Sequence, residues 1–137
     1  LTKYVKQRIL FNQLQFSITN TGMIDAGINV NMEINPSIDR DGSILDYCRL
    51  NDITIQPWSP FQYGFFEGVF LDNDKFPELN EKINEIASAY NVTNTAIAIA
   101  WILRHPARMQ PIIGTTKAQR VKDVAKASDI RLTREEW

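Results

Sequence analysis

The sequence has little cysteine, little net charge and no long apolar run, and each shortage excludes a class of protein. Its one cysteine, Cys48, cannot form an intramolecular disulfide and is predicted to be a small buried apolar residue. A net charge of −1 gives no overall attraction to nucleic acid or to an anionic membrane, so any anion site must be local. No apolar run approaches the roughly 20 residues that span a bilayer, and no signal peptide is recognisable. We therefore expect a cytoplasmic protein without nucleic-acid or membrane partners.

Residues that carry acid–base, nucleophilic or metal chemistry are equally scarce. The single histidine, His105, stands between Arg104 and Pro106 at a predicted helix end, where it is expected to cap that end at the surface. Neither a metal-ligand spacing nor a nucleophile–base arrangement occurs along the chain. The clustered acidic residues fall in predicted helices and turns, which is typical of a solvated face; they are Asp72, Asp74, Glu78, Glu81 and Glu85. We therefore expect a binding site without a catalytic residue or a metal ligand.

Three short segments have the composition of β-strands. Residues 10–16 alternate apolar and polar positions, and residues 53–58 are rich in β-branched and aromatic side chains. Residues 109–113 lie between Pro106 and Gly114 and are mostly apolar. Helical patterns separate these segments, so the chain is predicted to have an α/β fold of parallel βα units.

The predicted helices are marked by apolar spacing and by residues that cap helix ends. One apolar stripe at helical spacing comprises Leu79, Ile83, Ile86, Ala87 and Tyr90. Thr93 is the expected N-cap of a helix whose residues 96–103 are apolar nearly all round, and Pro106 prevents it from continuing. Thr116 is expected to cap a third helix, in a capping box with Gln119.

The spacing of the predicted strands favours a barrel. About 50 residues separate successive strands, which is long for a doubly wound domain and fits a (β/α)8 barrel with insertions. Three strands cannot close such a barrel and would leave open parallel edges. The chain also opens on Leu1 in helical spacing with Val5, and it stops one turn after a capping box of Thr133 with Glu136. We therefore expect residues 1–137 to be part of one larger domain, without an internal boundary.

A phosphate site is predicted after the third strand. Gly114 lets the backbone turn sharply, and the N–H groups at the start of the following helix attract anions. The hydroxyls of Thr115 and Thr116, the ammonium of Lys117 and the guanidinium of Arg120 would complete a cradle for a phosphate monoester. The alternative is an ordinary βα turn with a capping threonine and surface cations, and the residues alone leave both interpretations open.

The second strand ends on an aromatic residue and a long loop. The indole of Trp58 is available to stack on a flat ring. Residues 61–76 carry Gly64 and Gly68 among aromatic side chains, and they are predicted to form a mobile flap over a ligand. Alternatively, Trp58 fills the interior of the barrel and the aromatic side chains pack the loop against the body.

The first strand contains two amides, Asn12 and Gln13, among apolar residues. An inward-pointing Gln13 needs a hydrogen-bond partner. A ligand carboxamide, a neighbouring strand and water are the alternatives.

These segments together resemble the C-terminal half of the aldo-keto reductases, particularly their bacterial oxidoreductase branch. The resemblance rests on residues 11–17 (FNQLQFS) at the first strand, on residues 56–60 (QPWSP) at the second, and on residues 111–117 (PIIGTTK) with Arg120 at the third. Residues 98–103, around Trp101, are similar to the family's penultimate barrel helix. The three motifs follow the family's order and cover nearly the whole chain.

The resemblance implies strands 6 to 8 of a (β/α)8 TIM barrel that holds an extended NADP(H). It implies that Gln13 bonds the carboxamide, that Trp58 stacks on the nicotinamide ring and that Ser59 with the following loop lines the pyrophosphate. The threonines, Lys117 and Arg120 would hold the 2′-phosphate and the adenosine end. The implied cofactor-binding residues are Gln13, Trp58, Ser59, Pro60, Gly64, Ile113, Gly114, Thr115, Thr116, Lys117 and Arg120. Where the family commonly has an adenine-contacting Asn, this chain has Val124.

The resemblance also implies an activity that this chain does not complete. The family reduces aldehydes or ketones with a tetrad of Asp, Tyr, Lys and His from the first half of the barrel, and no tyrosine here lies in a matching motif. We therefore expect no catalytic residue in this chain, with the rest of the barrel as its partner and a small carbonyl compound as substrate. The alternatives are a non-catalytic NADP-binding or sensing module of the same fold, and a self-contained small α/β phosphate-binding domain.

Overall fold

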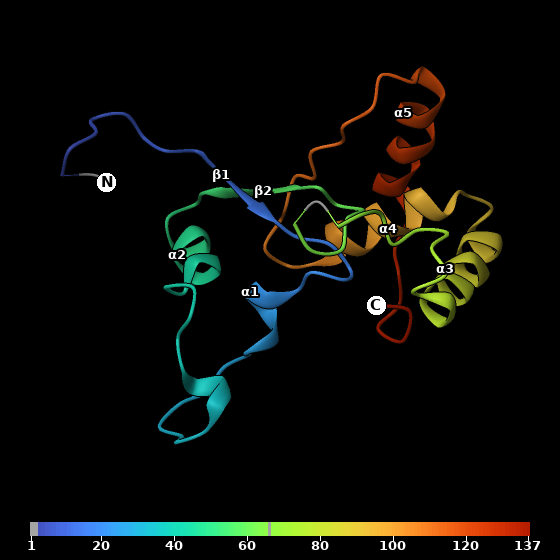
Figure 1. Ribbon diagram of the computed structural model, residues 1–137. Helices are drawn as coiled ribbons and strands as arrows, with labels where there is room; N and C mark the ends of the chain where they lie inside the picture. The colour runs from blue at the N-terminus through green and yellow to red at the C-terminus, as the bar shows by residue number, and fades with distance from the viewer. Residues whose placement is uncertain (1–2, 66) are drawn as a thin grey trace.

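A computed structural model describes residues 3–65 and 67–137. Its sheet consists of two parallel strands, β1 (Phe11–Gln15) and β2 (Thr54–Trp58), at the centre of Figure 1. Their register pairs Phe11 with Thr54 and Gln15 with Trp58. The first two predicted strands are confirmed, each slightly shorter than expected.

The third predicted strand does not form a regular strand. Residues 109–113 do lie alongside β2, because the N–H of Gln110 donates to the carbonyl of Ile55 (2.9 Å) and that of Ile112 to the carbonyl of Pro57 (2.8 Å). In a complete parallel ladder the residues of β2 on this side would also donate N–H groups back, and Pro57 has none. The prediction of a regular strand is therefore wrong, and the missing N–H of Pro57 removes one of the bonds that such a strand needs.

Three longer helices form one group beside the sheet (Figure 1): α3 (Pro77–Tyr90), α4 (Asn94–Arg104) and α5 (Ala118–Ala125). The predicted stripe of α3 is confirmed, with Ile83, Ile86 and Ala87 buried. The predicted N-cap of α4 is also confirmed, because Oγ1 of Thr93 accepts a hydrogen bond from the N–H of Ala96 at 3.2 Å. Within the described part of the chain, no single helix is both long and apolar enough to cross a membrane; α3 and α4 reach that criterion only together, across a bend of 93°.

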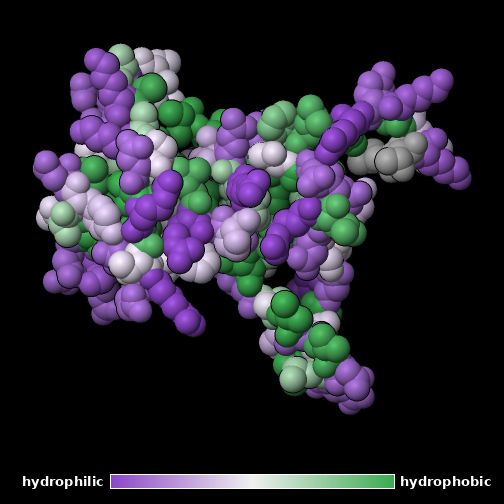
Figure 2. Space-filling model, turned by 180° about the vertical axis from the view of Figure 1, so that it is seen from behind, coloured by the Kyte–Doolittle hydropathy of each residue, from purple (hydrophilic) through white to green (hydrophobic). Residues whose placement is uncertain are grey.

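The remaining short elements lie mostly on the other side of the sheet. They are α1 (Gly22–Asp25), α2 (Ile44–Leu50) and two 3-10 turns at Asn35–Ser37 and Lys126–Asp129, the last of which packs on α4. Between α1 and α2, residues 27–43 project away from the sheet (Figure 1), and apolar surface gathers on this projection in Figure 2. Ile28 and Val30 expose 92% and 75% of their surface there, so the projection contributes little to the core.

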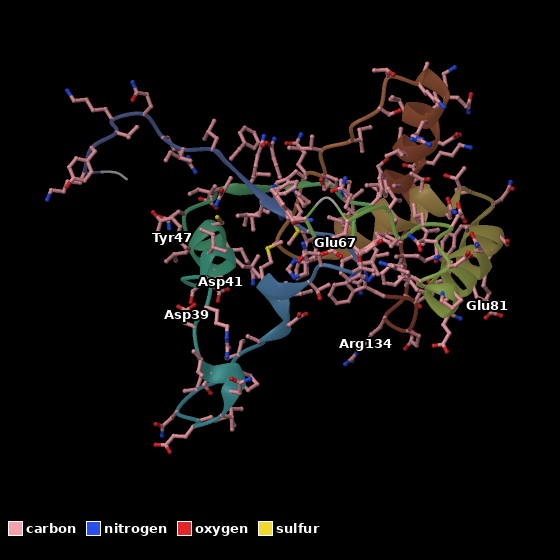
Figure 3. All side chains as sticks on the ribbon, viewed as in Figure 1. Asp39, Asp41, Tyr47, Glu67, Glu81 and Arg134 are labelled. Atoms are coloured by element: carbon pink, nitrogen blue, oxygen red, sulfur yellow. The ribbon has the colours of Figure 1, made fainter. Side chains whose placement is uncertain are left out.

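Where the projection leads into α2, its backbone is held by the carboxylate of Asp39. Oδ1 of Asp39 accepts hydrogen bonds from the N–H groups of Asp41, Gly42 and Ser43. These bonds, that from Asp41 foremost, hold the pKa of Asp39 below its usual range. Figure 3 places Asp39 and Asp41 beside α2, whereas Glu81 lies on α3 at the far side of the molecule. The acidic side chains of the 72–85 segment are all exposed, as predicted.

The two faces of the sheet differ in how far they are buried. One face carries Leu14, Ile55 and Pro57 into a core that also contains Phe16 and Ile102. Cys48 belongs to the same core, with 1% of its surface exposed, and this confirms the prediction that it is a buried apolar residue. The opposite face carries the alternate residues of both strands and is largely uncovered by the described residues.

His105 ends α4 as expected, but it is less exposed than predicted. Its ring is partly buried, with centroids 6.4 Å from Phe16 and 6.0 Å from Trp137, and its Nδ1 accepts the N–H of Ala107 at 3.2 Å. Burial lowers the pKa of His105, and the nearby charge of Arg49 lowers it further. The sequence could not indicate this burial, because the covering rings come from distant parts of the chain.

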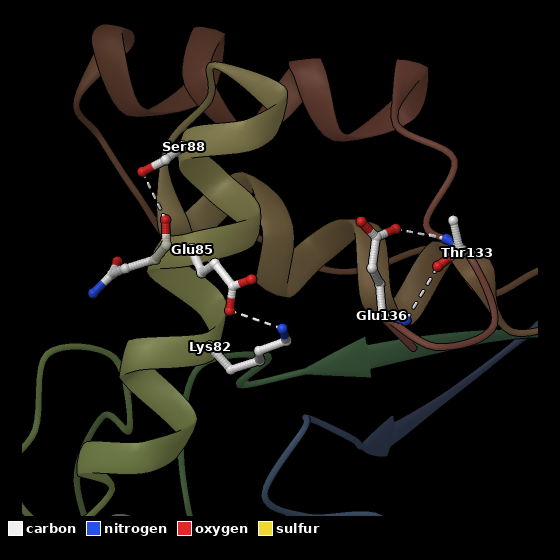
Figure 4. A network of polar contacts seen from close by, with 6 residues as sticks. Lys82, Glu85, Ser88, Thr133 and Glu136 are labelled. Atoms are coloured by element: carbon white, nitrogen blue, oxygen red, sulfur yellow. Dashed lines mark hydrogen bonds and ion pairs between the residues drawn. The ribbon is translucent and has the colours of Figure 1, made fainter.

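Hydrogen bonds attach residues 136 and 137 to α3 and α4. Trp101 and Trp137 each donate an indole N–H to the other's carbonyl, at 3.0 Å and 2.9 Å. The predicted capping box is confirmed: the N–H of Thr133 donates to Glu136 at 2.8 Å and the N–H of Glu136 to Oγ1 of Thr133 at 3.2 Å (Figure 4). The hydroxyl of Tyr90 on α3 also donates to Glu136, at 3.0 Å.

These contacts make stability depend on pH through Glu136. The N–H of Thr133, more than any other group, lowers the pKa of Glu136 in the folded chain. A group with a depressed folded-state pKa stabilises the fold above its unfolded-state value of about 4.3, and this contribution is lost as the pH falls through the folded-state value. We expect Glu136→Gln to be less stable than the wild type at pH 7 in urea titrations, with the gap closing toward pH 3. Glu135→Gln is the control, and an equal gap at both pH values would contradict the expectation.

Candidate cofactor site

The C-terminal ends of β1 and β2 bring polar and aromatic side chains together on the uncovered face. The register pairs Gln15 with Trp58, so both side chains lie on this face at the strand ends. Trp58 is partly exposed, and its ring meets Phe65 edge-on, with centroids 6.0 Å apart at 85°. The structure thus places the indole at the strand end and not in the packed core, as stacking on a ligand ring requires.

The chain turns sharply at Ser59, immediately after β2. Ser59 has a φ of +50°, a left-handed conformation that costs an ordinary residue about 1–2 kcal/mol. Its carbonyl accepts the N–H of Gln62 at 3.0 Å, and Pro60 between them is buried. Strained backbone of this kind concentrates at functional sites. No signal in the sequence indicated it, because serine is not typical of left-handed positions.

Hydrogen bonds connect the loop after β2 to β1 and to the residues that follow β1. Nε2 of Gln15 donates to the carbonyl of Gly64 at 2.7 Å, and the buried hydroxyl of Ser17 donates to the carbonyl of Gln62 at 2.8 Å. Tyr63 packs against Phe76 with ring centroids 5.0 Å apart. The structure therefore favours the alternative in which the aromatic side chains pack the loop against the body.

Two glycines in this loop are required by its geometry. Gly64 and Gly68 have φ values of +67° and +135°. A Cβ on Gly64 would lie 2.8 Å from the side chain of Glu67, and one on Gly68 would lie 3.2 Å from the ring of Tyr63. The contribution of Gln15 and Ser17 to the loop was not predicted, although Gln15 shares a strand face with Gln13 and was recognisable by that alternation.

Gln13 finds its partner on the neighbouring strand. Its Nε2 donates to Oε1 of Gln56 at 3.3 Å, and Nε2 of Gln56 donates to Oε1 of Gln110 at 2.9 Å. Asn12, on the opposite face, directs its amide to the sulfur of Cys48 at 3.6 Å. Among the described residues, none donates a hydrogen bond to Oε1 of Gln13. This acceptor remains available to a ligand on the uncovered face.

The predicted phosphate loop lies at the start of α5. Lys117 is the N-cap residue, and among the described residues no side-chain hydrogen bond caps the helix. Oγ1 of Thr115 accepts a hydrogen bond from the N–H of Lys117 at 3.2 Å. The side chain of Gln119 is directed toward the C-terminal end of the helix, where its Nε2 donates to Oδ1 of Asp123 at 2.9 Å. The predicted capping box of Thr116 with Gln119 is therefore wrong, because the Thr115 turn starts the helix one residue later.

The same arrangement leaves the helix start accessible to an anion. The side chains of Thr116, Lys117 and Arg120 are exposed, and neither cation forms an ion pair within residues 3–65 and 67–137. Uncapped N–H groups and unpaired cations at one helix end suit a phosphate. Val124, by contrast, is 6% exposed and faces the core, so it offers no polar contact to a base.

The structure thus arranges the predicted residues in two groups joined by one segment. Gln13, Trp58 and Ser59 lie at the sheet, whereas the residues from Gly114 to Arg120 lie at the start of α5. Residues 111–113 connect them and are bonded to β2 through Ile112. An extended ligand with a flat ring at one end and a phosphate at the other matches this arrangement.

Comparisons with known proteins agree on one family. The family model described as "Aldo/keto reductase family" matches residues 6–137. A 6-dehydroglucose reductase of Novosphingobium aromaticivorans is 31% identical over 93 residues, which are 68% of this chain and 30% of that protein. An aldo-keto reductase of Schizosaccharomyces pombe, named as yakc [NADP(+)], is 28% identical over 110 residues, covering 66% of this chain and 32% of its own length.

A solved structure shares the fold. A thermostable aldo-keto reductase crystallised with the inhibitor epalrestat superposes with a TM-score of 0.64 at 22% identity, over 98% of this chain and 39% of that protein. The chain thus spans between 30% and 39% of the length of these proteins. Because the family model covers nearly every residue, including both groups of the site, this chain belongs to the aldo-keto reductase family.

Proposed function

We propose that this chain forms the C-terminal part of a (β/α)8 barrel, with β1, β2 and residues 109–113 as its sixth, seventh and eighth strands. The parallel pairing of β1 with β2, and the two hydrogen bonds from residues 109–113 to β2, support this assignment. The uncovered sheet face leaves Phe11 50% exposed. In the whole protein the remaining strands would cover that face, so the rest of the barrel is the chain's structural partner.

We propose further that the whole protein is an NADP(H)-dependent oxidoreductase that reduces an aldehyde or a ketone. The observation that carries this proposal is the uncapped start of α5, where the cations of Lys117 and Arg120 have no carboxylate partner in the described part of the chain. A 2′-phosphate supplies the missing negative charge, and NAD(H) has no such group. The relative named for NADP(+) belongs to the same family.

Each group of the site would hold one end of the cofactor. Gln13 would bond the carboxamide and Trp58 would stack on the nicotinamide ring, while Ser59, Pro60 and Gly64 would line the pyrophosphate. The phosphate end would be held by Ile113, Gly114, Thr115, Thr116, Lys117 and Arg120. Bound NADPH supplies the hydride, and the residues of this chain bind and orient it. We assign no catalytic residue to this chain; those groups belong to the part of the barrel that faces it.

Removing the guanidinium of Arg120 tests this proposal. We expect Arg120→Ala in the whole protein to weaken NADPH binding roughly 10- to 100-fold, because a charge-assisted hydrogen bond contributes about 1.5–3 kcal/mol. NADH binding should change little. Dissociation constants for both cofactors are measured by fluorescence titration. Lys122→Ala, an exposed cation elsewhere on α5, is the control. An equal loss of affinity for NADPH and NADH, or no loss for either, would contradict the assignment of the 2′-phosphate to Arg120.

A further inference from the structure

The projection between α1 and α2 turns its apolar side chains outward. Residues 28–35 (INVNMEIN) alternate apolar and polar positions. The exposed aliphatic residues of the projection, here called the apolar patch, are Ile28, Val30, Met32, Ile34 and Ile38. Each of them exposes between 48% and 92% of its surface, and apolar surface gathers at this end of the molecule in Figure 2.

The polar side chains of the projection form hydrogen bonds within it. Nδ2 of Asn29 donates to the carbonyls of Ala26 and Pro36. The guanidinium of Arg40 donates to Oδ1 of Asn35 at 2.6 Å and to the carbonyl of Asn35 at 3.2 Å. A segment that faces only water has the opposite arrangement, with its polar side chains outward. The projection is therefore braced from within and presents apolar surface, as an interaction site does.

The rest of the proposed barrel lies on the other side of the sheet from this patch. Nδ2 of Asn12 is directed to the sulfur of Cys48 on α2 at 3.6 Å, and Asn12 lies on the strand face opposite Gln13. Because α1 contacts α2, both helices lie on the buried side of the sheet, and the projection between them extends away from it (Figure 1). The remaining strands would cover the uncovered face instead, so they are not in position to cover the patch.

We propose that the apolar patch is an interface through which two copies of the whole protein associate about a two-fold axis. Such an interface brings the same surface of each copy together, so the surface must be compatible with itself. From Ile28 to Ile38 the only charged residue is Glu33, and interface cores are depleted in charge and enriched in methionine. Two copies therefore meet with little repulsion between like charges.

The area of the patch suits a weak dimer. At the exposures given above, the five side chains present apolar surface on the order of 500 Å², near the upper end for the largest patch on a monomer. Two patches face to face bury about 1,000 Å² in total, which is the lower limit for a specific interface. We therefore expect a dissociation constant on the order of 1–100 μM.

Sedimentation velocity of the whole protein over a series of concentrations tests the proposal. The wild type should shift from monomer to dimer as the concentration passes through this range. The double variant Val30→Ser, Met32→Ser should weaken self-association at least about 10-fold, because each substitution is repeated on both copies. Leu50→Ser is the control, since Leu50 is an exposed aliphatic residue on α2, outside the projection.

The melting temperature of the dilute, monomeric protein separates a second copy from another part of the same chain as the occupant. If a second copy covers the patch, the double variant and the wild type melt together under these conditions. A monomeric wild type at about 100 μM, or an unchanged association in the double variant, would overturn the proposal. A lower melting temperature of the dilute double variant would also overturn it, by showing that the patch is covered within one chain. None of these measurements involves NADPH, so the proposed cofactor binding stands or fails separately.

Discussion

Replacing Ile102 with alanine is expected to lower the free energy of unfolding by about 2–5 kcal/mol. Ile102 lies on α4, which packs against α3, α5 and the 3-10 turn that follows α5, and none of its surface is exposed. The substitution removes buried apolar atoms and leaves a cavity that rigid helices on several sides cannot fill. The loss is large relative to the total stability of an ordinary domain.

Urea unfolding of the whole protein measures this effect, and the adjacent residue provides the control. Leu103 is on the same helix but exposes 38% of its surface, so Leu103→Ala removes apolar atoms that are already partly in water. Its expected cost is less than half that of Ile102→Ala. Equal costs for the two variants would show that α4 is not packed on the side assigned to the core.

Helices α3 and α4 and the first two strands were predictable because their signals are local, whereas α1 and α2 were not predicted. The apolar stripe of α3, the hydroxyl cap at Thr93 and the alternation along β1 each depend on residues within a few positions of one another. The third strand depends instead on a distant donor. Residues 109–113 have a strand-like composition, but Pro57 on the neighbouring strand lacks the N–H that would complete the ladder. The same limit explains why the burial of His105 was not predicted.

In the candidate site, too, local features were predictable from the sequence and long-range contacts were not. The types of residue that we propose to hold a ring and a phosphate were recognisable from short motifs after each strand. Their mutual arrangement was not recognisable from the sequence. The hydrogen bond from Gln15 to Gly64, and those from Gln13 to Gln56 and from Gln56 to Gln110, join segments that are far apart along the chain. Two hydroxyls in succession also made the helix start ambiguous: Thr115, and not Thr116, forms the turn that sets it.

Asn80 on α3 holds the segment that leads from the loop after β2 into the helix. Only 8% of its surface is exposed, and its Oδ1 accepts the N–H of Asp72 at 2.8 Å. Its Nδ2 donates to the carbonyls of Phe70 and Phe76, at 2.8 Å and 2.9 Å, and to that of Asn73 at 3.3 Å. One buried amide thus contacts four backbone groups, and for two of them, the N–H of Asp72 and the carbonyl of Phe70, it is the only partner among the described residues.

We expect Asn80→Leu to lower the free energy of unfolding by about 2–4 kcal/mol, since each buried group left without a partner costs about 1–3 kcal/mol and some of them regain water. The matched control is Asn84→Leu, one turn further along α3, where the side chain is exposed. Urea unfolding at pH 7 measures both. A cost for Asn80→Leu no larger than that of the control would show that the segment does not depend on this amide.

Asn80→Asp isolates the contribution of the donor. The substitution keeps the oxygen that accepts from Asp72 but turns a second oxygen toward three carbonyls, so the ionised carboxylate is disfavoured in the folded chain. The folded-state pKa of the introduced carboxyl should therefore be raised above its unfolded value of about 3.9. Its penalty is then largest at neutral pH and is relieved as the pH falls through the raised pKa, because the protonated carboxyl donates to one of the carbonyls. Unfolding of Asn80→Asp and the wild type at pH 7 and pH 4 should show the gap narrowing in acid, and a gap that widens would contradict this orientation of the amide.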